Sequence, residues 1–156
     1  MGMSPVSIRE AYEKYGDELV RFASGLAGPA DGPDAVSAAM LGVMGSSNWE
    51  SVRNERAYLY AAVLNEVRRN HRRTMRRRAA EAAGVDSPRG NPIPDIRPDV
   101  LDAVGRLSVR QRAVVFLAYW EDLRPAEIAR RLGLSPSTVY RNLERAERRL
   151  RRLLHE

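Results

Sequence analysis

The sequence predicts an all-α protein made of two small helical domains. Apolar residues recur at spacings of three and four along most of the chain, and no segment shows the alternation that is typical of a β-strand. Residues 84–98 interrupt this pattern with four of the nine prolines, so they are predicted to form an extended linker. The predicted domains are therefore residues 1–83 and residues 99–156.

Three helices are predicted in the N-terminal domain, over residues 8–28, 33–44 and 55–83. The first has an apolar stripe at spacings of four and three, formed by Ile8, Tyr12, Tyr15, Leu19, Phe22 and Leu26. The buried positions predicted for the other two helices are Val36, Met40, Val43, Leu59, Ala62, Val63 and Val67. Trp49 falls in the loop between these two helices, where it either contacts a nucleic-acid base or covers the small core.

The C-terminal domain is predicted to begin with a helix over residues 99–105. A second helix starts at Ser108 and buries Val114, Val115 and Leu117. Two more helices follow from residue 125 onward, and Glu121 and Asp122 lie in the turn before them. Carboxylates at that place suit the positive end of the next helix.

Residues 125–154 have the pattern of a DNA-reading helix-turn-helix. Gly133 supplies the tight turn, Ser135 the N-cap and Pro136 the first position of the second helix. The buried stripe of that helix is predicted to be Val139, Leu143, Ala146, Leu150 and Leu153. Its opposite face carries side chains that can reach a major groove, namely Ser137, Thr138, Tyr140, Arg141 and Arg145. The alternative is an ordinary helical hairpin with a solvated arginine face.

Positive charge is concentrated in two separate blocks. The whole chain has a net charge of +6 and a pI of about 10.3, which favours a polyanionic partner. Residues 54–83 carry 8 basic and 3 acidic side chains, and residues 106–156 carry 12 and 6, whereas the remaining segments are net acidic. This distribution predicts two separate contacts with nucleic acid.

The first basic block lies on the predicted third helix. Residues 68–78 read RRNHRRTMRRR, and their arginines point to nearly every side of the helix, which suits the neutralisation of phosphates. Tyr58, Tyr60 and Asn65 precede this run and offer stacking and base-edge hydrogen bonds to single-stranded DNA. Alternatively, one of the two tyrosines packs in the core.

Several classes of site are excluded by composition. The chain has no cysteine, which rules out disulfides, thiolate catalysis and cysteine zinc sites. Its two histidines, His71 and His155, lie far apart, and no carboxylate pair or phosphate loop is visible, so no metal, cofactor or enzymatic activity is predicted. No apolar run has membrane-spanning length and no signal peptide is visible, which predicts a cytoplasmic, nucleoid-associated protein without membrane insertion.

Residues 106–154 resemble region 4 of bacterial sigma-70 family sigma factors, most closely the extracytoplasmic-function (ECF, group IV) class. The matching features are LSVRQR at 107–112, AEIA at 126–129, LGLS at 132–135, Thr138-Val139 and Arg145-Ala146. Residues 7–28 and 58–78 are similar to the first helix and the promoter-reading helix of region 2. The resemblance covers nearly the whole chain.

This resemblance implies a sigma factor that binds RNA polymerase core and directs promoter-specific initiation, without catalytic residues of its own. Region 4 would read the minus-thirty-five element through Arg124, Ser135, Ser137, Thr138, Tyr140, Arg141 and Arg145. Region 2 would contact the minus-ten element through Trp49, Tyr58, Asn65, Arg68, Arg69, Arg72 and Arg73. The implied partners are promoter DNA, the beta-prime clamp helices and beta flap of polymerase, and an anti-sigma factor.

The helix that would dock on the clamp helices departs from the family pattern. The docking candidates are Asp34, Ser37, Met40 and Leu41, but small residues stand where region 2 usually carries acidic and glutamine side chains. An alternative is therefore a stand-alone sigma-like regulator that binds DNA with altered polymerase docking. A third interpretation is a sigma-like decoy that a regulatory protein binds, with DNA binding secondary.

Overall fold

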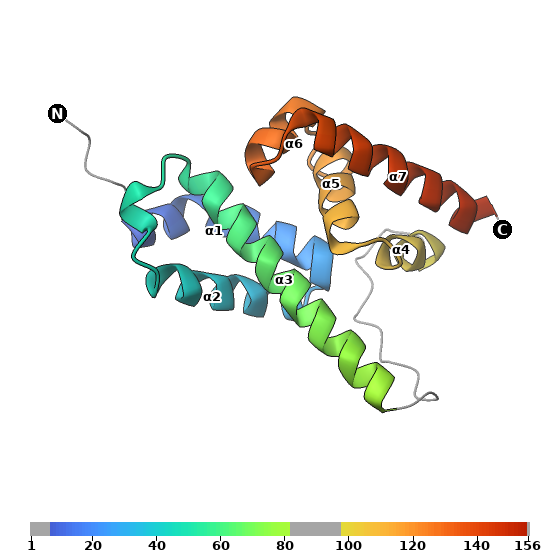
Figure 1. Ribbon diagram of the computed structural model, residues 1–156, viewed down its shortest axis with the longest axis horizontal. Helices are drawn as coiled ribbons and strands as arrows, with labels where there is room; N and C mark the ends of the chain where they lie inside the picture. Colours follow the sequence, from blue (N-terminus) through green and yellow to red (C-terminus); the bar gives the residue numbers. More distant parts are fainter. Residues whose placement is uncertain (1–6, 82–97, 156) are drawn as a thin grey trace.

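The computed structural model describes residues 7–81 and 98–155, and within them it contains helices and turns but no strand (Figure 1). The helices are α1 (Ile8–Ala27), α2 (Asp31–Met44), α3 (Glu55–Ala80), α4 (Pro98–Gly105), α5 (Val109–Tyr119), α6 (Pro125–Leu132) and α7 (Pro136–His155), with a short 3-10 helix, η1 (Trp49–Ser51), before α3. The all-α prediction is confirmed. The predicted linker, apart from Pro98, lies outside the described residues.

Local side-chain hydrogen bonds fix where the helices begin. The Ser7 hydroxyl accepts from the Glu10 N–H at the start of α1, and the Asn54 side chain accepts from the Ala57 N–H at the start of α3. Ser108 forms a reciprocal capping box with Gln111 at the start of α5. These caps satisfy backbone N–H groups that have no partner inside the helix, so each start agrees with its prediction to within a residue.

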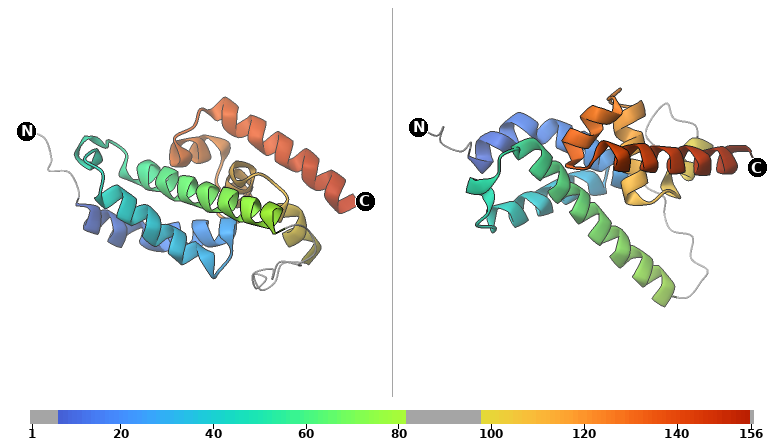
Figure 2. Two further views of the ribbon diagram at one scale, coloured as in Figure 1. Left: turned by 60° about the horizontal axis from the view of Figure 1, so that its bottom comes forward. Right: turned by 45° about the horizontal axis from the view of Figure 1, so that its top comes forward.

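Helices α1, α2 and α3 form the N-terminal half of the molecule (Figure 1). The short turn after Gly28 makes α1 and α2 antiparallel neighbours, and α3 packs across both. The predicted stripe of α2 is buried, with Val36, Met40 and Val43 all facing the core. Beyond Val67 no residue of α3 is buried, and the C-terminal half of this helix projects from the body (Figure 2).

Helices α4 to α7 form the C-terminal half. Gly133 ends α6 with a φ of +67°, a left-handed conformation that glycine adopts without strain, so the turn of the helix-turn-helix is formed as predicted. On α7 only Val139 and Ala146 are fully buried, while Leu143, Leu150 and Leu153 are half-buried. The predicted stripe is therefore only partly covered, because the end of this long helix extends past α5 and α6 (Figure 1).

The two halves share one continuous apolar core. Buried side chains from α1, α2 and α3 form a single cluster with those from α5, α6 and the start of α7. A smaller cluster, formed by Leu107, Val115 and Ala146, connects α7 to α5 and to the turn before α5. Tyr12, the second residue of the predicted α1 stripe, lies outside the core and is 45% exposed, whereas its neighbour Ala11 is buried.

Candidate nucleic-acid interface

The start of α7 presents a polar and cationic face to solvent. The Ser135 hydroxyl accepts from the Thr138 N–H at 3.2 Å, which makes Ser135 the N-cap of this helix and leaves Thr138 half-buried. The side chains of Ser137, Tyr140, Arg141 and Arg145 are exposed, as is Arg124 at the start of α6. No carboxylate among the described residues pairs with Arg141 or Arg145. Both guanidinium groups are therefore available to phosphates or base edges.

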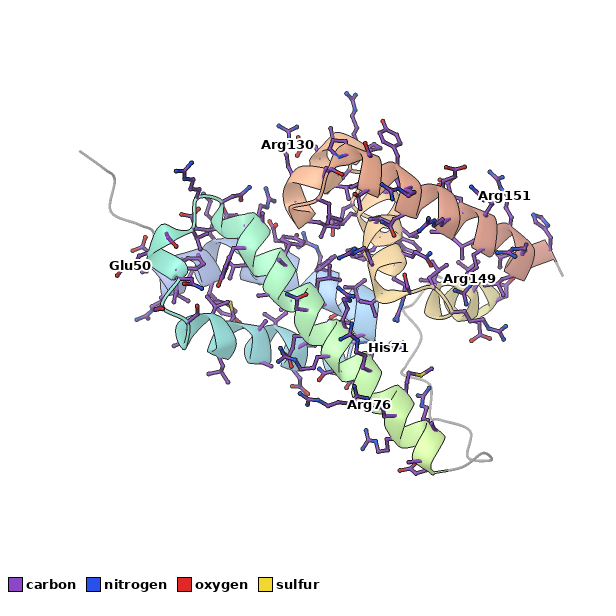
Figure 3. All side chains as sticks on the ribbon, in the orientation of Figure 1. Glu50, His71, Arg76, Arg130, Arg149 and Arg151 are labelled. Carbon is purple, nitrogen blue, oxygen red and sulfur yellow. The ribbon has the colours of Figure 1, made fainter. Side chains whose placement is uncertain are left out.

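The projecting half of α3 carries the second cationic surface. Asn65, Arg69, Arg72 and Arg73 are exposed, and Arg68 is half-buried. The structure pairs Arg69 with Glu66 at 3.2 Å, one turn away on the same helix, and the Arg69 side chain remains 62% exposed. Figure 3 shows that His71 and Arg76 lie on this part of the helix, well apart from Arg151 on α7.

Trp49 is the first residue of η1, between α2 and α3, and it is buried. Its side chain is 7% exposed and meets the ring of Tyr58 edge-on, with 5.9 Å between the ring centroids. Trp49 was expected either to contact a nucleic-acid base or to cover the small core, and this placement corresponds to the second alternative. Tyr60 is also buried, whereas Tyr58 is half-buried against Trp49. Asn65 is thus the exposed uncharged candidate for contacts with bases on α3.

The outer face of α2 is partly apolar. Asp34, Ser37 and Leu41 are exposed and share one side of the helix with Met44, and the exposed fractions of Leu41 and Met44 are 69% and 62%. Met40 was a docking candidate, but it does not share this surface. It belongs to the stripe that faces α1 and α3, and only 7% of its side chain is exposed.

Comparisons with known proteins bear on these surfaces. Residues 97–150 match the family described as Sigma-70, region 4. The chain is 32% identical over 150 residues to the RNA polymerase sigma-E factor of Streptomyces antibioticus, and this match covers 86% of the chain and 77% of the relative. The RNA polymerase sigma-E factor of Streptomyces coelicolor is 33% identical over 145 residues, with 86% and 78% covered.

The chain belongs to the sigma-70 family. Its class is that of the ECF sigma factors, which direct transcription initiation and are not enzymes. In fold, this sigma factor is similar to the sigma factor RpoE of Bartonella quintana, solved in complex with the anti-sigma factor NepR, with a TM-score of 0.67 at 21% identity. That match covers 94% of this chain and 96% of the other.

Two further features are absent from the part of the sigma factor that the structure describes. No group of histidine and acidic side chains within residues 7–81 and 98–155 could hold a metal ion. In the same ranges, no helix is both long enough and apolar enough to cross a membrane.

A carboxylate in the N-terminal half of the sigma factor organises contacts from three helices. Glu18 of α1 accepts two hydrogen bonds from Arg56 of α3, at 2.6 and 2.8 Å, and one from the hydroxyl of Tyr60, at 2.9 Å. Arg131 of α6 reaches the same carboxylate at 3.6 Å and donates to the Tyr60 hydroxyl at 3.4 Å. This Glu18 cluster therefore joins the N-terminal and C-terminal halves of the molecule.

Electrostatics keep the Glu18 cluster in one charge state near neutral pH. Burial alone would raise the pKa of Glu18, but the hydrogen bonds from Arg56 and Tyr60 and the charges of Arg56 and Arg131 outweigh it and hold this pKa below its usual value. Burial raises the pKa of Tyr60 to about 12, and the neighbouring Glu18 carboxylate acts in the same direction. The hydrogen bond and charge of Arg131 oppose this shift but do not cancel it. The carboxylate is thus ionised and the phenol neutral.

The raised pKa of Tyr60 predicts a loss of stability in alkali. The folded protein keeps the phenolic proton between pH 10 and about 12, whereas the unfolded chain releases it from about pH 10 upward. The contribution of Tyr60 is therefore complete below pH 10 and is lost as the pH rises through about 12. We expect Tyr60→Phe to flatten this decline in urea unfolding measured from pH 8 to 12. Parallel curves for wild type and Tyr60→Phe would contradict the assignment.

Sequence reasoning missed the Glu18 cluster and its partner on α6. From the sequence, Arg56, Arg131 and Glu18 entered only into the charge distribution along the chain. One signal was present: Arg131 follows the buried Ile128 by three residues, so it lies beside the apolar face of α6 rather than opposite it. An arginine at such an edge can lay its stem along the core and reach a carboxylate beyond it.

Proposed function

We propose that this sigma factor binds RNA polymerase core and recruits it to promoters through two DNA contacts. The start of α7 enters the major groove of the minus-thirty-five element, and α3 contacts the minus-ten element. The observation that carries the proposal is the exposed Ser137, Tyr140, Arg141 and Arg145 face, which directly follows the Gly133 turn. This is the geometry in which a helix-turn-helix reads base edges.

The two DNA contacts differ in chemistry. On α7, a few polar and guanidinium groups at the helix start are suited to hydrogen bonds with base edges. On α3, most of the candidate groups are arginines that follow one another along a projecting helix, so phosphate neutralisation dominates there. Asn65 is positioned to add a base contact at the inner end of that surface.

Polymerase docking is assigned to the exposed face of α2. Asp34, Ser37 and Leu41 offer one charge, one hydroxyl and one apolar side chain to the beta-prime clamp helices, and the exposed Met44 extends the apolar part. The region 4 half contacts the beta flap. Because the fold is similar to that of a sigma factor solved with an anti-sigma factor, we also propose such a regulator as a partner. The protein acts in the cytoplasm, on nucleoid DNA.

In vitro transcription with purified core polymerase tests this function. The sigma factor should start transcription at a subset of a broad pool of promoter fragments, and core polymerase alone should not. DNA binding without transcription from any fragment would contradict the proposal and favour a stand-alone regulator. Capture by a regulatory protein with neither transcription nor DNA binding would favour a decoy.

Arg141→Ala tests how α7 reads DNA. Loss of a bidentate contact to a base edge should weaken promoter binding by about 1–3 kcal/mol and relax sequence preference at one position. Arg151→Ala is the matched control, because Arg151 is exposed on the same helix ten residues further on, about 15 Å along its axis. Affinity and preference can be measured by fluorescence anisotropy on single-base variants of the promoter. Equal behaviour of the two variants would refute a reading role for Arg141.

A further inference from the structure

Arg112, in the first turn of α5, has two donor atoms that are buried without a partner. Its Nη1 donates to the carbonyl oxygen of Leu26 in the last turn of α1, at 2.6 Å. Its Nε and Nη2 are covered from solvent and meet no hydrogen-bond acceptor within residues 7–81 and 98–155. Burial lowers the pKa of this guanidinium, but an arginine in a protein keeps its charge. Charged donors left in this state are costly, so an acceptor from outside the chain would bind here with a gain in free energy.

The two unpartnered nitrogens are the pair that binds oxyanions side-on. In a guanidinium group, the N–H of Nε and one N–H of Nη2 point in the same direction, and together they bind two oxygens of one carboxylate or phosphate. The hydrogen bond to Leu26 uses the third nitrogen, Nη1, which lies outside this pair. We call Nε and Nη2 the Arg112 fork. Its geometry is suited to an acceptor with two adjacent oxygens.

Two basic side chains of α3 lie near Arg112. His71 and Arg78 are seven residues apart, which places them on one face of α3, about two turns from each other. Burial and the charges of Arg112 and Arg78 lower the pKa of His71, so these groups lie within electrostatic range of one another. No carboxylate in the described parts of the chain forms an ion pair with any of the three. Basic groups from α3 and α5 thus converge without a negative partner.

We propose that the Arg112 fork, His71 and Arg78 form a binding site for a small phosphate-bearing anion, at the place where α3, α5 and the end of α1 meet. The fork binds two phosphate oxygens, and His71 and Arg78 donate to the others. Phosphate suits the site better than a carboxylate, because it carries more negative charge near neutral pH and has more than two acceptor oxygens.

Burial favours a free anion over the backbone of a nucleic acid. The Arg112 fork is covered, whereas His71 and Arg78 are exposed, so a compact anion can approach from the side of α3. A phosphate in a DNA duplex is fixed on a wide, stiff helix and does not reach a covered fork. The inference goes beyond the proposed function and does not depend on it.

The two histidines of the chain give a direct readout. Inorganic phosphate is titrated into the isotope-labelled sigma factor at pH 7, and the imidazole resonances are followed by NMR, with sodium chloride at the same ionic strength as the reference. A bound anion should raise the pKa of His71, so its resonances should move towards those of the charged form and then saturate. His155, at the end of α7, should respond equally to phosphate and chloride.

Arg112→Lys tests the fork itself. Lysine keeps the positive charge but is a point charge without two parallel donors. Loss of one charge-assisted hydrogen bond should raise the dissociation constant for inorganic phosphate about tenfold or more. Circular dichroism of the variant checks that it is folded.

Arg78→Gln gives a second test at an exposed position, where the change does not disturb the core. It should weaken phosphate binding about threefold. Arg76→Gln is the matched control, because Arg76 is also an exposed arginine of α3 (Figure 3) but is not among the groups that shift the pKa of His71. This control should leave the dissociation constant nearly unchanged.

Three outcomes would overturn the proposal. Identical responses of His71 to phosphate and chloride would mean that the Arg112 fork is hydrated instead. Equal weakening by Arg76→Gln and Arg78→Gln would mean that phosphate senses only the net charge of α3. A response of His71 to a short DNA duplex but not to inorganic phosphate would assign these groups to the DNA backbone. Transcription enters none of these measurements, so failure of this site and failure of the proposed function are distinguishable.

Discussion

Replacing Glu18 with alanine is expected to lower the free energy of unfolding by about 3 kcal/mol. The substitution removes the acceptor of two Arg56 hydrogen bonds and one Tyr60 hydrogen bond, and it leaves Arg131 with no nearby negative charge. The cost is large because the side chains of Glu18 and Arg131 are only 17% and 12% exposed, so water cannot replace the contact that Arg131 loses. Urea unfolding followed by circular dichroism at neutral pH measures it.

Glu13→Ala is the matched control for this prediction. Glu13 pairs with Arg9 on the same helix, but both side chains are well exposed, so its loss should change stability by less than about 1 kcal/mol. A second change, Arg131→Met, should recover part of the loss in the Glu18→Ala protein, because it removes the buried charge left without a partner. If Glu18→Ala costs no more than Glu13→Ala, the Glu18 cluster contributes little to stability.

Phe22→Ala is expected to destabilise both halves of the protein by about 3–5 kcal/mol. Phe22 is fully buried, and its ring lies 4.8 Å from that of Tyr60 and 6.2 Å from that of Phe116, measured between centroids. Truncation would leave a cavity where the cores of the two halves meet. Phe22→Leu should cost clearly less, since it keeps most of the apolar volume.

The two tryptophans allow each half to be followed separately. Trp49 lies in the N-terminal half, and Trp120 lies in the C-terminal half, stacked on Phe116. In single-tryptophan backgrounds, Trp49→Phe and Trp120→Phe, the Phe22→Ala change should move the urea midpoint of both signals. A shift confined to the Trp49 signal would mean that the halves unfold independently and that their shared core does not couple them.

The helices could be predicted from sequence because their determinants are local. Ser7, Asn54 and Ser108 cap helices that begin within a residue of the predicted starts. Helix α2 begins two residues before its predicted start at Pro33, since Asp31 and Gly32 continue the helix upstream of the proline. The first turn of a helix tolerates proline at more than one position, so a proline marks the start of a helix only approximately.

The sequence predicted which helices carry the candidate site better than it predicted which of their side chains are exposed. The exposed face of α7 follows from helical periodicity, which places Arg141 and Arg145 one turn apart on the side opposite Val139. Periodicity could not decide between the roles of Trp49, because an aromatic residue in a short polar segment can lie on the surface or fold back onto a core. Met40 was predicted both as a buried position of its helix and as a polymerase-docking residue. In the structure it is buried against α1 and α3.

Contacts between the halves could not be predicted from sequence. Phe22 and Phe116, or Arg112 and Leu26, are separated by most of the chain, so neither spacing nor propensity connects them. Arg112 also belongs to the segment that resembles region 4, and that resemblance says nothing about a carbonyl at the end of α1. Only the three-dimensional arrangement shows which arginines of this arginine-rich chain face solvent and which do not.

The Glu18 cluster also has a consequence for genetics. Its members come from α1, α3 and α6, and Glu18 and Arg131 are more than one hundred residues apart in the sequence. Alleles that damage one half should therefore be compensated by second-site suppressors in the other, clustered on α6 for lesions at Glu18. A screen that mutagenises only the segment carrying the original defect would miss them.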